Sequence, residues 1–222
     1  MPFLLMAEIL NIKLKNENFA IVEFDSGVGL IVPKLLVYEL GLRKGDILGE
    51  EALNSLSREN ELYSCEQKAL GYLGRRLHSK MELRRKLYQK KFTKPVIESI
   101  IEKLSNIKYI DDRKYAELMI NESMNLRHDG VQKTKARLME KGVDKKIIEE
   151  MLAETKDFDV EMDNIKLVGN KKLLSLKKRF TDKRQVDQKL TAYLVGKGFS
   201  FEIIKEYLKA AGTDPGDFEE QT

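Results

Sequence analysis

Few residues of this chain have the types and spacing that catalysis needs. The two histidines, His78 and His128, and the only cysteine, Cys65, stand far apart in the sequence. Adjacent acids at Asp111 and Asp112 could bind a metal or act as an acid–base pair, but no further residue follows at a ligand spacing, so capping of a helix is expected instead. Two histidines in loops give little support for general acid–base chemistry. We therefore expect no catalytic residues, no metal and no cofactor.

The sequence motifs of common enzymes are missing as well. Segment 41–46, Gly-Leu-Arg-Lys-Gly-Asp, superficially resembles a phosphate loop, but its glycine spacing is wrong and no Lys-Ser/Thr pair ends it. The chain has no dinucleotide fingerprint, no paired cysteines for zinc, no HExxH and no nucleophile elbow. A single cysteine allows no disulfide within the chain, and neither a signal peptide nor a membrane span is expected. These features favour a non-enzymatic, cytoplasmic protein.

Charge is distributed in blocks, although the formal net charge is only +4. From Arg75 to Lys94 there are 9 Lys or Arg against one Glu, and from Asn164 to Gly198 there are 10 against two Asp. Between them, Glu149 to Asp163 carries 7 acids and one Lys. The basic blocks predict contact with nucleic acid or with an acidic partner; solvated helix faces are the alternative.

The first basic block lies on two predicted helices within 79–104. Ser79 and Glu82 fit a capping box at the start of one helix. Thr93 is expected to cap the next, with Pro95 in its first turn, where a missing N–H matters little. Their apolar positions are Leu83, Leu87, Phe92, Val96, Ile97, Ile100, Ile101 and Leu104.

Six apolar positions of this helix pair recur twice, shifted by 51 and then by a further 56 residues. Lys-Gly precedes the second apolar position in both later copies. One copy is too small to bury its own apolar face, so neighbouring copies are expected to stack. The matching sets are Leu87, Phe92, Val96, Ile97, Ile100 and Ile101; Leu138, Val143, Ile147, Ile148, Met151 and Leu152; and Leu194, Phe199, Ile203, Ile204, Tyr207 and Leu208.

Polar residues mark helix starts in the later copies. Asp111 or its neighbour is expected to cap a helix, and Thr181 or Asp182 another. The pair 129–130, Asp-Gly, is interpreted as a chain break before a helix over 131–141.

The N-terminal region differs in kind from the repeats. Strands are predicted at 9–15, 19–24 and 28–32, where apolar and polar residues alternate or β-branched residues gather. A short helix follows over 33–40, ended by Gly41. A polar helix over 50–61 is expected to link this region to the first repeat, which begins near Ser64.

The predicted fold is mostly α: three tandem three-helix repeats in an elongated stack, preceded by a small N-terminal β-hairpin or β-meander. The predicted domains are 1–62 for the N-terminal region, 63–107, 108–156 and 157–212 for the repeats, and 213–222 for an acidic tail that is expected to be disordered.

Three segments resemble a known family. The run 74–87, Gly-Arg-Arg-Leu-His-Ser-Lys-Met-Glu-Leu-Arg-Arg-Lys-Leu, and the run 109–116, Tyr-Ile-Asp-Asp-Arg-Lys-Tyr-Ala, look like RecX, the regulatory protein of the RecA recombinase. Segment 130–143 is similar to the family's next element. The likeness covers most of the chain from Ser64 to Ala210, and the family often has glycine at the position of Lys91.

The resemblance implies a non-catalytic modulator of RecA in homologous recombination, DNA repair and the SOS response. RecX-like proteins lie in the groove of the RecA filament on single-stranded DNA and alter its ATPase and strand exchange, usually as inhibitors. A monomer is expected, with single- or double-stranded DNA as a further partner. The candidate contacts to RecA or DNA are Arg75, Arg76, Lys80, Arg84 and Arg85 on one surface, and Lys171, Lys172, Lys177, Lys178, Arg179, Lys183 and Arg184 on a second.

Other functions remain open at this point. Three-helix units with basic second helices would also suit a stand-alone DNA-binding protein with helix-turn-helix-like modules, but no helix shows a clear base-reading set of Arg, Asn and Gln. A structural α-repeat adaptor is a second alternative. An enzyme is the last, and turnover lost on changing His78, His128 or Cys65 would support it.

Overall fold

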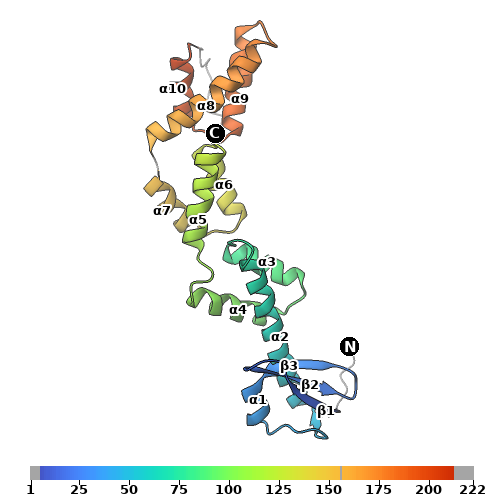
Figure 1. Ribbon diagram of the computed structural model, residues 1–222. Helices are drawn as coiled ribbons and strands as arrows, with labels where there is room; N and C mark the ends of the chain where they lie inside the picture. Colours follow the sequence, from blue (N-terminus) through green and yellow to red (C-terminus); the bar gives the residue numbers. More distant parts are fainter. Residues whose placement is uncertain (1–5, 156, 213–222) are drawn as a thin grey trace. The chain divides into compact units, whose positions relative to one another are not determined.

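The computed structural model describes residues 6–155 and 157–212, and the predicted acidic tail lies outside them. The chain is mostly helical with a small N-terminal sheet, as predicted (Figure 1). It divides into two compact units. One contains the residues up to 77 together with 83–110, and the other contains 78–82 together with the residues from 111 onward.

In the part of the chain that the structure describes, the N-terminal sheet has four antiparallel strands, one more than predicted. They are β1 (Met6–Leu14), β2 (Phe19–Phe24), β3 (Gly29–Pro33) and β4 (Ile47–Gly49), in the order β3-β2-β1-β4. Strand β4 pairs with the first residues of β1. Its three residues are too few to show the alternation by which strands are predicted, so the sequence gives no sign of this strand. The short helix α1 (Lys34–Glu39) forms as predicted and ends before Gly41, which has a φ of 61°.

A single helix, α2 (Glu50–Leu73), replaces the two helices that were expected here. The predicted break near Ser64 is wrong, and the physical reason is that neither Gly nor Pro interrupts the sequence from 50 to 70. The first half of α2 supports the sheet: the Asn60 side chain accepts a 2.8 Å hydrogen bond from the backbone N–H of Ile31. Its second half holds the core residues Cys65 and Ala69 of the first helix triplet.

Among the described residues, nine of the helices form three triplets. The first combines α2 with α3 (Lys80–Gln89) and α4 (Lys94–Asn106). The second comprises α5 (Asp112–Asn121), extended by one π-helical turn over Glu122–Leu126, with α6 (Val131–Glu140) and α7 (Lys145–Thr155). The third comprises α8 (Phe158–Lys177), α9 (Lys183–Gly196) and α10 (Phe201–Ala210).

The repeated apolar positions form the cores of these triplets, as the pattern predicts. All eighteen are buried except Phe92 and Ile147, which are half-buried. The turns between the second and third helices also correspond, because Lys91, Gly142 and Gly198 adopt φ values of 66°, 71° and 87°. Both observations support one module repeated three times.

The predicted helix caps are mostly confirmed. Asp111 and Asp182 accept hydrogen bonds from the first backbone N–H groups of α5 and α9. The Ser79 hydroxyl accepts one, of 3.0 Å, from the N–H of Glu82. Thr93 precedes α4 but does not cap it; its backbone N–H and its hydroxyl instead donate to the Glu61 carboxylate of α2, at 2.6 and 3.1 Å.

Both histidines lie in loops, as predicted, but neither side chain is fully exposed to solvent. His78 is only 3% exposed. His128 is half-buried, and its Nδ1 lies 2.7 Å from Oδ1 of Asn164 in α8. Cys65 faces the interior as expected, and burial raises the pKa of its thiol to about 12, which makes it a poor nucleophile at neutral pH.

Candidate interaction surfaces

Five of the predicted contact residues surround one turn of the third triplet. Lys177, Lys178 and Arg179 lie at the end of α8, and Lys183 and Arg184 at the start of α9. All five side chains are exposed. We call this group the α8–α9 corner. Because only three residues separate the two basic runs, the fold brings these cations together.

The other two residues of this predicted surface lie farther along α8. Lys171 is six residues before Lys177, about 9 Å along a helix axis at 1.5 Å per residue. Lys171 is exposed, whereas the ammonium group of Lys172 lies 5.0 Å from the ring centre of Tyr193 in α9. Lys172 thus contributes to packing of α8 against α9, and Lys171 extends the basic surface away from the corner.

The positive charge of the corner is poorly compensated. Among residues 6–155 and 157–212, none of its five cations forms a salt bridge. The nearby acid Asp182 uses its Oδ1 to accept the backbone N–H of Arg184 at 2.9 Å. Several exposed cations around one turn create a local positive potential that attracts phosphate or carboxylate groups.

The part of the acidic block that lies in α7 is partly neutralised within the second triplet. Glu149 lies 3.5 Å from Lys135 and 3.8 Å from Lys145, and Glu150 pairs with Arg113. A block of charge that looks like a partner surface in the sequence therefore includes ordinary internal pairs. The basic corner differs, because its charges are left for solvent or for a partner.

The residues of the other predicted surface have mixed roles. Arg75 and Arg76 are exposed after α2, and Nη1 of Arg76 donates to the carbonyl of Leu77 at 2.9 Å. Arg84 makes two 2.7 Å hydrogen bonds to the Glu98 carboxylate of α4, and these bonds lower the pKa of Glu98. Arg84 therefore holds α3 against α4. A paired guanidinium is less available to a partner.

The remaining two residues of that surface lie on α3. Lys80 begins the helix, and its backbone N–H donates to Oδ1 of Asp112 at 2.8 Å, within the second compact unit. Arg85 is exposed on the following turn, within the first unit. The grouping of these five residues into a single surface stays a prediction.

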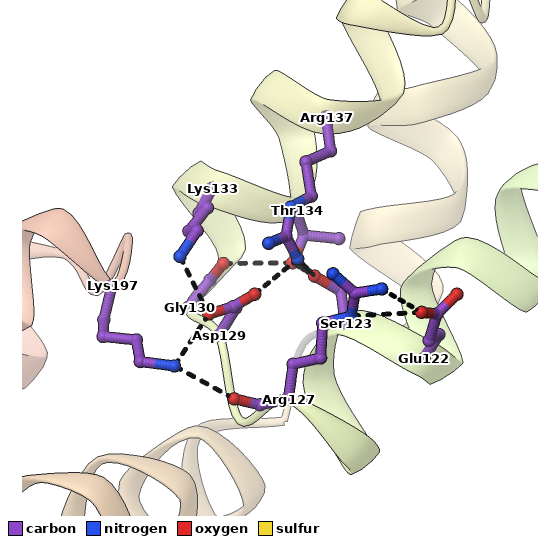
Figure 2. Close-up of polar contacts among 9 residues, drawn as sticks. All are labelled: Glu122, Ser123, Arg127, Asp129, Gly130, Lys133, Thr134, Arg137 and Lys197. Carbon is purple, nitrogen blue, oxygen red and sulfur yellow. Dashed lines mark hydrogen bonds and ion pairs between the residues drawn. The ribbon is translucent and has the colours of Figure 1, made fainter.

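One polar site is not predicted by the local sequence. Asp129, expected to be part of a chain break, is only 1% exposed and accepts contacts from three cations (Figure 2). Lys133 and Lys197 lie 3.2 and 3.1 Å from its Oδ1, and Arg137 pairs with its Oδ2. The Asp-Gly sequence indicates a turn, and nothing in it reveals a lysine 68 residues away.

Ionisation of Asp129 reflects two opposing effects. Burial by itself raises the pKa of this carboxyl, because the charged form loses its hydration. Hydrogen bonds from Lys197 and Lys133, together with the charges of Lys197 and Arg137, outweigh burial and lower the pKa below its ordinary value. Asp129 is thus a buried, paired anion.

Neither a metal-binding group of side chains nor a membrane-spanning helix occurs in the part of the chain that the structure describes. Within 6–155 and 157–212, His, Cys, Asp and Glu side chains do not gather in groups of three that could hold a metal ion. Over the same residues, no helix combines the length and apolar character needed to cross a bilayer. The features that distinguish this chain are charged surfaces and repeated modules.

Comparison with known families matches each triplet separately. The model described as "RecX, first three-helix domain" matches residues 65–104, the second domain matches 111–152 and the third matches 159–208. The third range lies within its helix triplet, the second runs from the Asp111 cap of α5 into α7, and the first covers the C-terminal part of α2 together with α3 and most of α4.

Curated relatives and a solved structure agree with these matches. "Regulatory protein RecX" of Clostridium acetobutylicum is 34% identical over 175 residues, which cover 78% of this chain and 81% of the relative. "Regulatory protein RecX" of Clostridium botulinum (strain Eklund 17B / Type B) is 29% identical over 93% of this chain and 97% of the relative. A crystal structure of regulatory protein RecX has the same fold, with a TM-score of 0.73 at 22% identity over 92% of this chain and 99% of that one. This chain belongs to the RecX family of regulatory proteins.

Proposed function

We propose that this protein is a non-catalytic inhibitor of RecA that binds the RecA filament on single-stranded DNA and lowers its ATPase and strand exchange. Membership of the RecX family over most of the chain supports regulation as the role. The α8–α9 corner is the single structural observation that carries the proposed contact, because its five exposed cations have no acidic partner among the described residues.

The α8–α9 corner would bind anionic groups of the filament, either DNA phosphates or acidic side chains of RecA. Lys171 would extend this surface, while Lys172 would help to hold α8 and α9 in place. Arg75, Arg76, Lys80 and Arg85 are proposed as the second contact, with Arg84 supporting it through Glu98. No covalent step is required, since a protein that binds one state of the filament better than another shifts the filament toward that state.

Reversal of charge at the start of α9 tests the corner. The variant Lys183→Glu, Arg184→Glu should fold normally, because acids at a helix N-terminus interact favourably with the helix dipole. Retention on RecA filaments should fall about tenfold or more at physiological salt, as expected for two lost charged contacts of about 1 kcal/mol each. The matched control is Arg43→Glu, Lys44→Glu, which makes the same change of charge at two exposed loop residues of the N-terminal region.

Two results would contradict the assignment. Equal retention of the corner variant and the unchanged protein would exclude the corner, and equal losses in both variants would indicate only a response to net charge. Salt dependence adds a second readout. If the corner binds single-stranded DNA, the slope of log K against log salt should shrink by about 0.7 for each phosphate contact removed. Tight, sequence-selective binding to duplex DNA without RecA would support the stand-alone DNA-binding alternative instead.

A further inference from the structure

The second and third triplets are joined by backbone hydrogen bonds at the start of α6. The N–H of Gly130 donates to the carbonyl of Lys197 at 2.8 Å, and the N–H of Gln132 donates to that of Gly198 at 3.0 Å. The first N–H groups of a helix have no partner within the helix itself. Here the turn between α9 and α10 supplies two of these partners, so the third triplet completes the start of α6.

The approach at this joint is close enough to require glycine on both sides. A Cβ atom at Gly130 would lie 2.3 Å from the carbonyl oxygen of Gly198. A Cβ atom at Gly198 would lie 2.4 Å from the backbone nitrogen of Lys133, and the φ of Gly198 is 87°. The joint is therefore a specific backbone contact, whereas a loose apposition of side chains would leave room for Cβ atoms.

Asp129 connects the two sides of this joint electrostatically. Lys133 and Arg137 reach its carboxylate from α6, within the second triplet, and Lys197 reaches it from the third triplet (Figure 2). Lys197 also donates to the carbonyl of Arg127 at 3.2 Å. Without the carboxylate, three cations would remain close together, and their mutual repulsion would destabilise the joint.

A related joint occurs one repeat earlier. Ser79 precedes Gly130 by 51 residues, and Lys141 precedes Lys197 by 56, which are the same shifts that relate the repeats. The Ser79 hydroxyl donates to the carbonyl of Lys141, and Nζ of Lys141 lies 3.8 Å from Oε1 of Glu82. Position 78, however, holds histidine where position 129 holds aspartate. The buried carboxylate is thus a property of the later joint alone.

We propose that Asp129 is a positioning residue that locks the third triplet to the second through Lys197. The lock sets the orientation of the α8–α9 corner relative to the second triplet. Its loss opens the joint locally and leaves the core of each triplet folded. This inference concerns the joint alone and holds whether or not the corner binds RecA.

Amide hydrogen exchange measured by NMR tests the lock, because the Gly130 and Gln132 amides report opening of the joint directly. In Asp129→Asn, both amides should exchange about tenfold faster or more, as expected for loss of a charge-assisted bond. The amides of Leu138 in α6 and Ile204 in α10, which lie in the two cores, should be unchanged. The control Asp163→Asn makes the same substitution at an acid that forms only a surface pair with Lys166, and it should alter none of the four amides.

Lys197→Met provides a second variant in case Asp129→Asn does not fold. It leaves Asp129 paired with Lys133 and Arg137. It should accelerate amide exchange at Gly130 and Gln132 without affecting the amides of Leu138 and Ile204. The double variant should open the joint by less than the sum of the two single variants, because the contact between Asp129 and Lys197 can be lost only once. Unchanged exchange at Gly130 and Gln132 in Lys197→Met, or equal acceleration at Leu138 and Ile204, would overturn the proposal.

Discussion

The turn between the second and third helices of each repeat contains one residue with positive φ, and the residue type at this position differs between the repeats. Lys91, Gly142 and Gly198 all adopt positive φ, a region that side chains other than glycine occupy at a cost of roughly 1–2 kcal/mol. Glycine is needed at 142 and 198 because a Cβ atom there would meet Met81 or Lys133 at 2.4 Å. Lys91 is exposed, so its side chain is accommodated despite the backbone strain.

Replacement of Lys91 by glycine should stabilise the protein slightly. The relieved strain exceeds the extra chain entropy that glycine brings to the unfolded state, so we expect a gain of up to about 1 kcal/mol in the free energy of unfolding. Urea unfolding at pH 7 measures it. Lys91→Ala keeps the strained backbone and should show no such gain. A loss of stability in Lys91→Gly would contradict this account of the turn.

The stability contribution of Asp129 should depend on pH. Its pKa is lower in the folded protein than in the unfolded chain, so the unfolded chain binds a proton more readily. The contribution is therefore fully present above the unfolded pKa of about 4 and is lost as pH falls through the folded pKa. The difference in unfolding free energy between the unchanged protein and Asp129→Asn should shrink from pH 7 to pH 3. A constant difference would show that the charge of Asp129 is not what stabilises the fold.

At the scale of elements, helix α2 couples the N-terminal sheet to the first triplet. It carries Leu56 under the sheet and Cys65 in the triplet core, and its Glu61 carboxylate binds both the backbone N–H and the hydroxyl of Thr93. A continuous helix of 24 residues fixes the orientation of its two ends relative to each other. Two helices with a flexible break between them would not do so. The N-terminal sheet is thereby fixed to the start of the repeats.

Proline at position 64 distinguishes a continuous helix from two helices. If a separate helix began near Ser64, proline would lie in its first turn and cost little. Within continuous α2, Ser64→Pro removes an internal hydrogen bond and should destabilise the protein by about 3 kcal/mol. Urea unfolding measures the effect, with Ser64→Ala as the control. A loss below about 1 kcal/mol for the proline variant would favour two helices.

Sequence periodicity predicts what depends on local spacing. The eighteen repeated apolar positions, the Asp111 and Asp182 caps and the basic α8–α9 turn all follow from residues close together in the chain. Strand β4 was missed because three residues show no alternation. The Asp129 site was missed because its defining partner, Lys197, comes from the next repeat. Local patterns cannot show which buried acid a distant lysine will reach.

For the whole molecule, the proposed function depends on where positive charge remains without an acidic partner. The net charge of +4 says little by itself, since Glu149 and Glu150 are paired within the second triplet. The α8–α9 corner keeps its positive charge exposed. Because exposed clusters of positive charge supply much of the affinity for polyanions, the corner should dominate the proposed association with a filament.

Inhibition of RecA can be measured through the single-stranded-DNA-dependent ATPase of RecA from the same organism. The protein should be titrated well below one copy per RecA, with a parallel assay of its binding to DNA alone. If the protein inhibits the RecA filament, ATP hydrolysis should fall in a dose-dependent way at concentrations where the protein does not affect DNA alone. An unchanged rate, together with no retention on RecA filaments, would contradict the proposed inhibition.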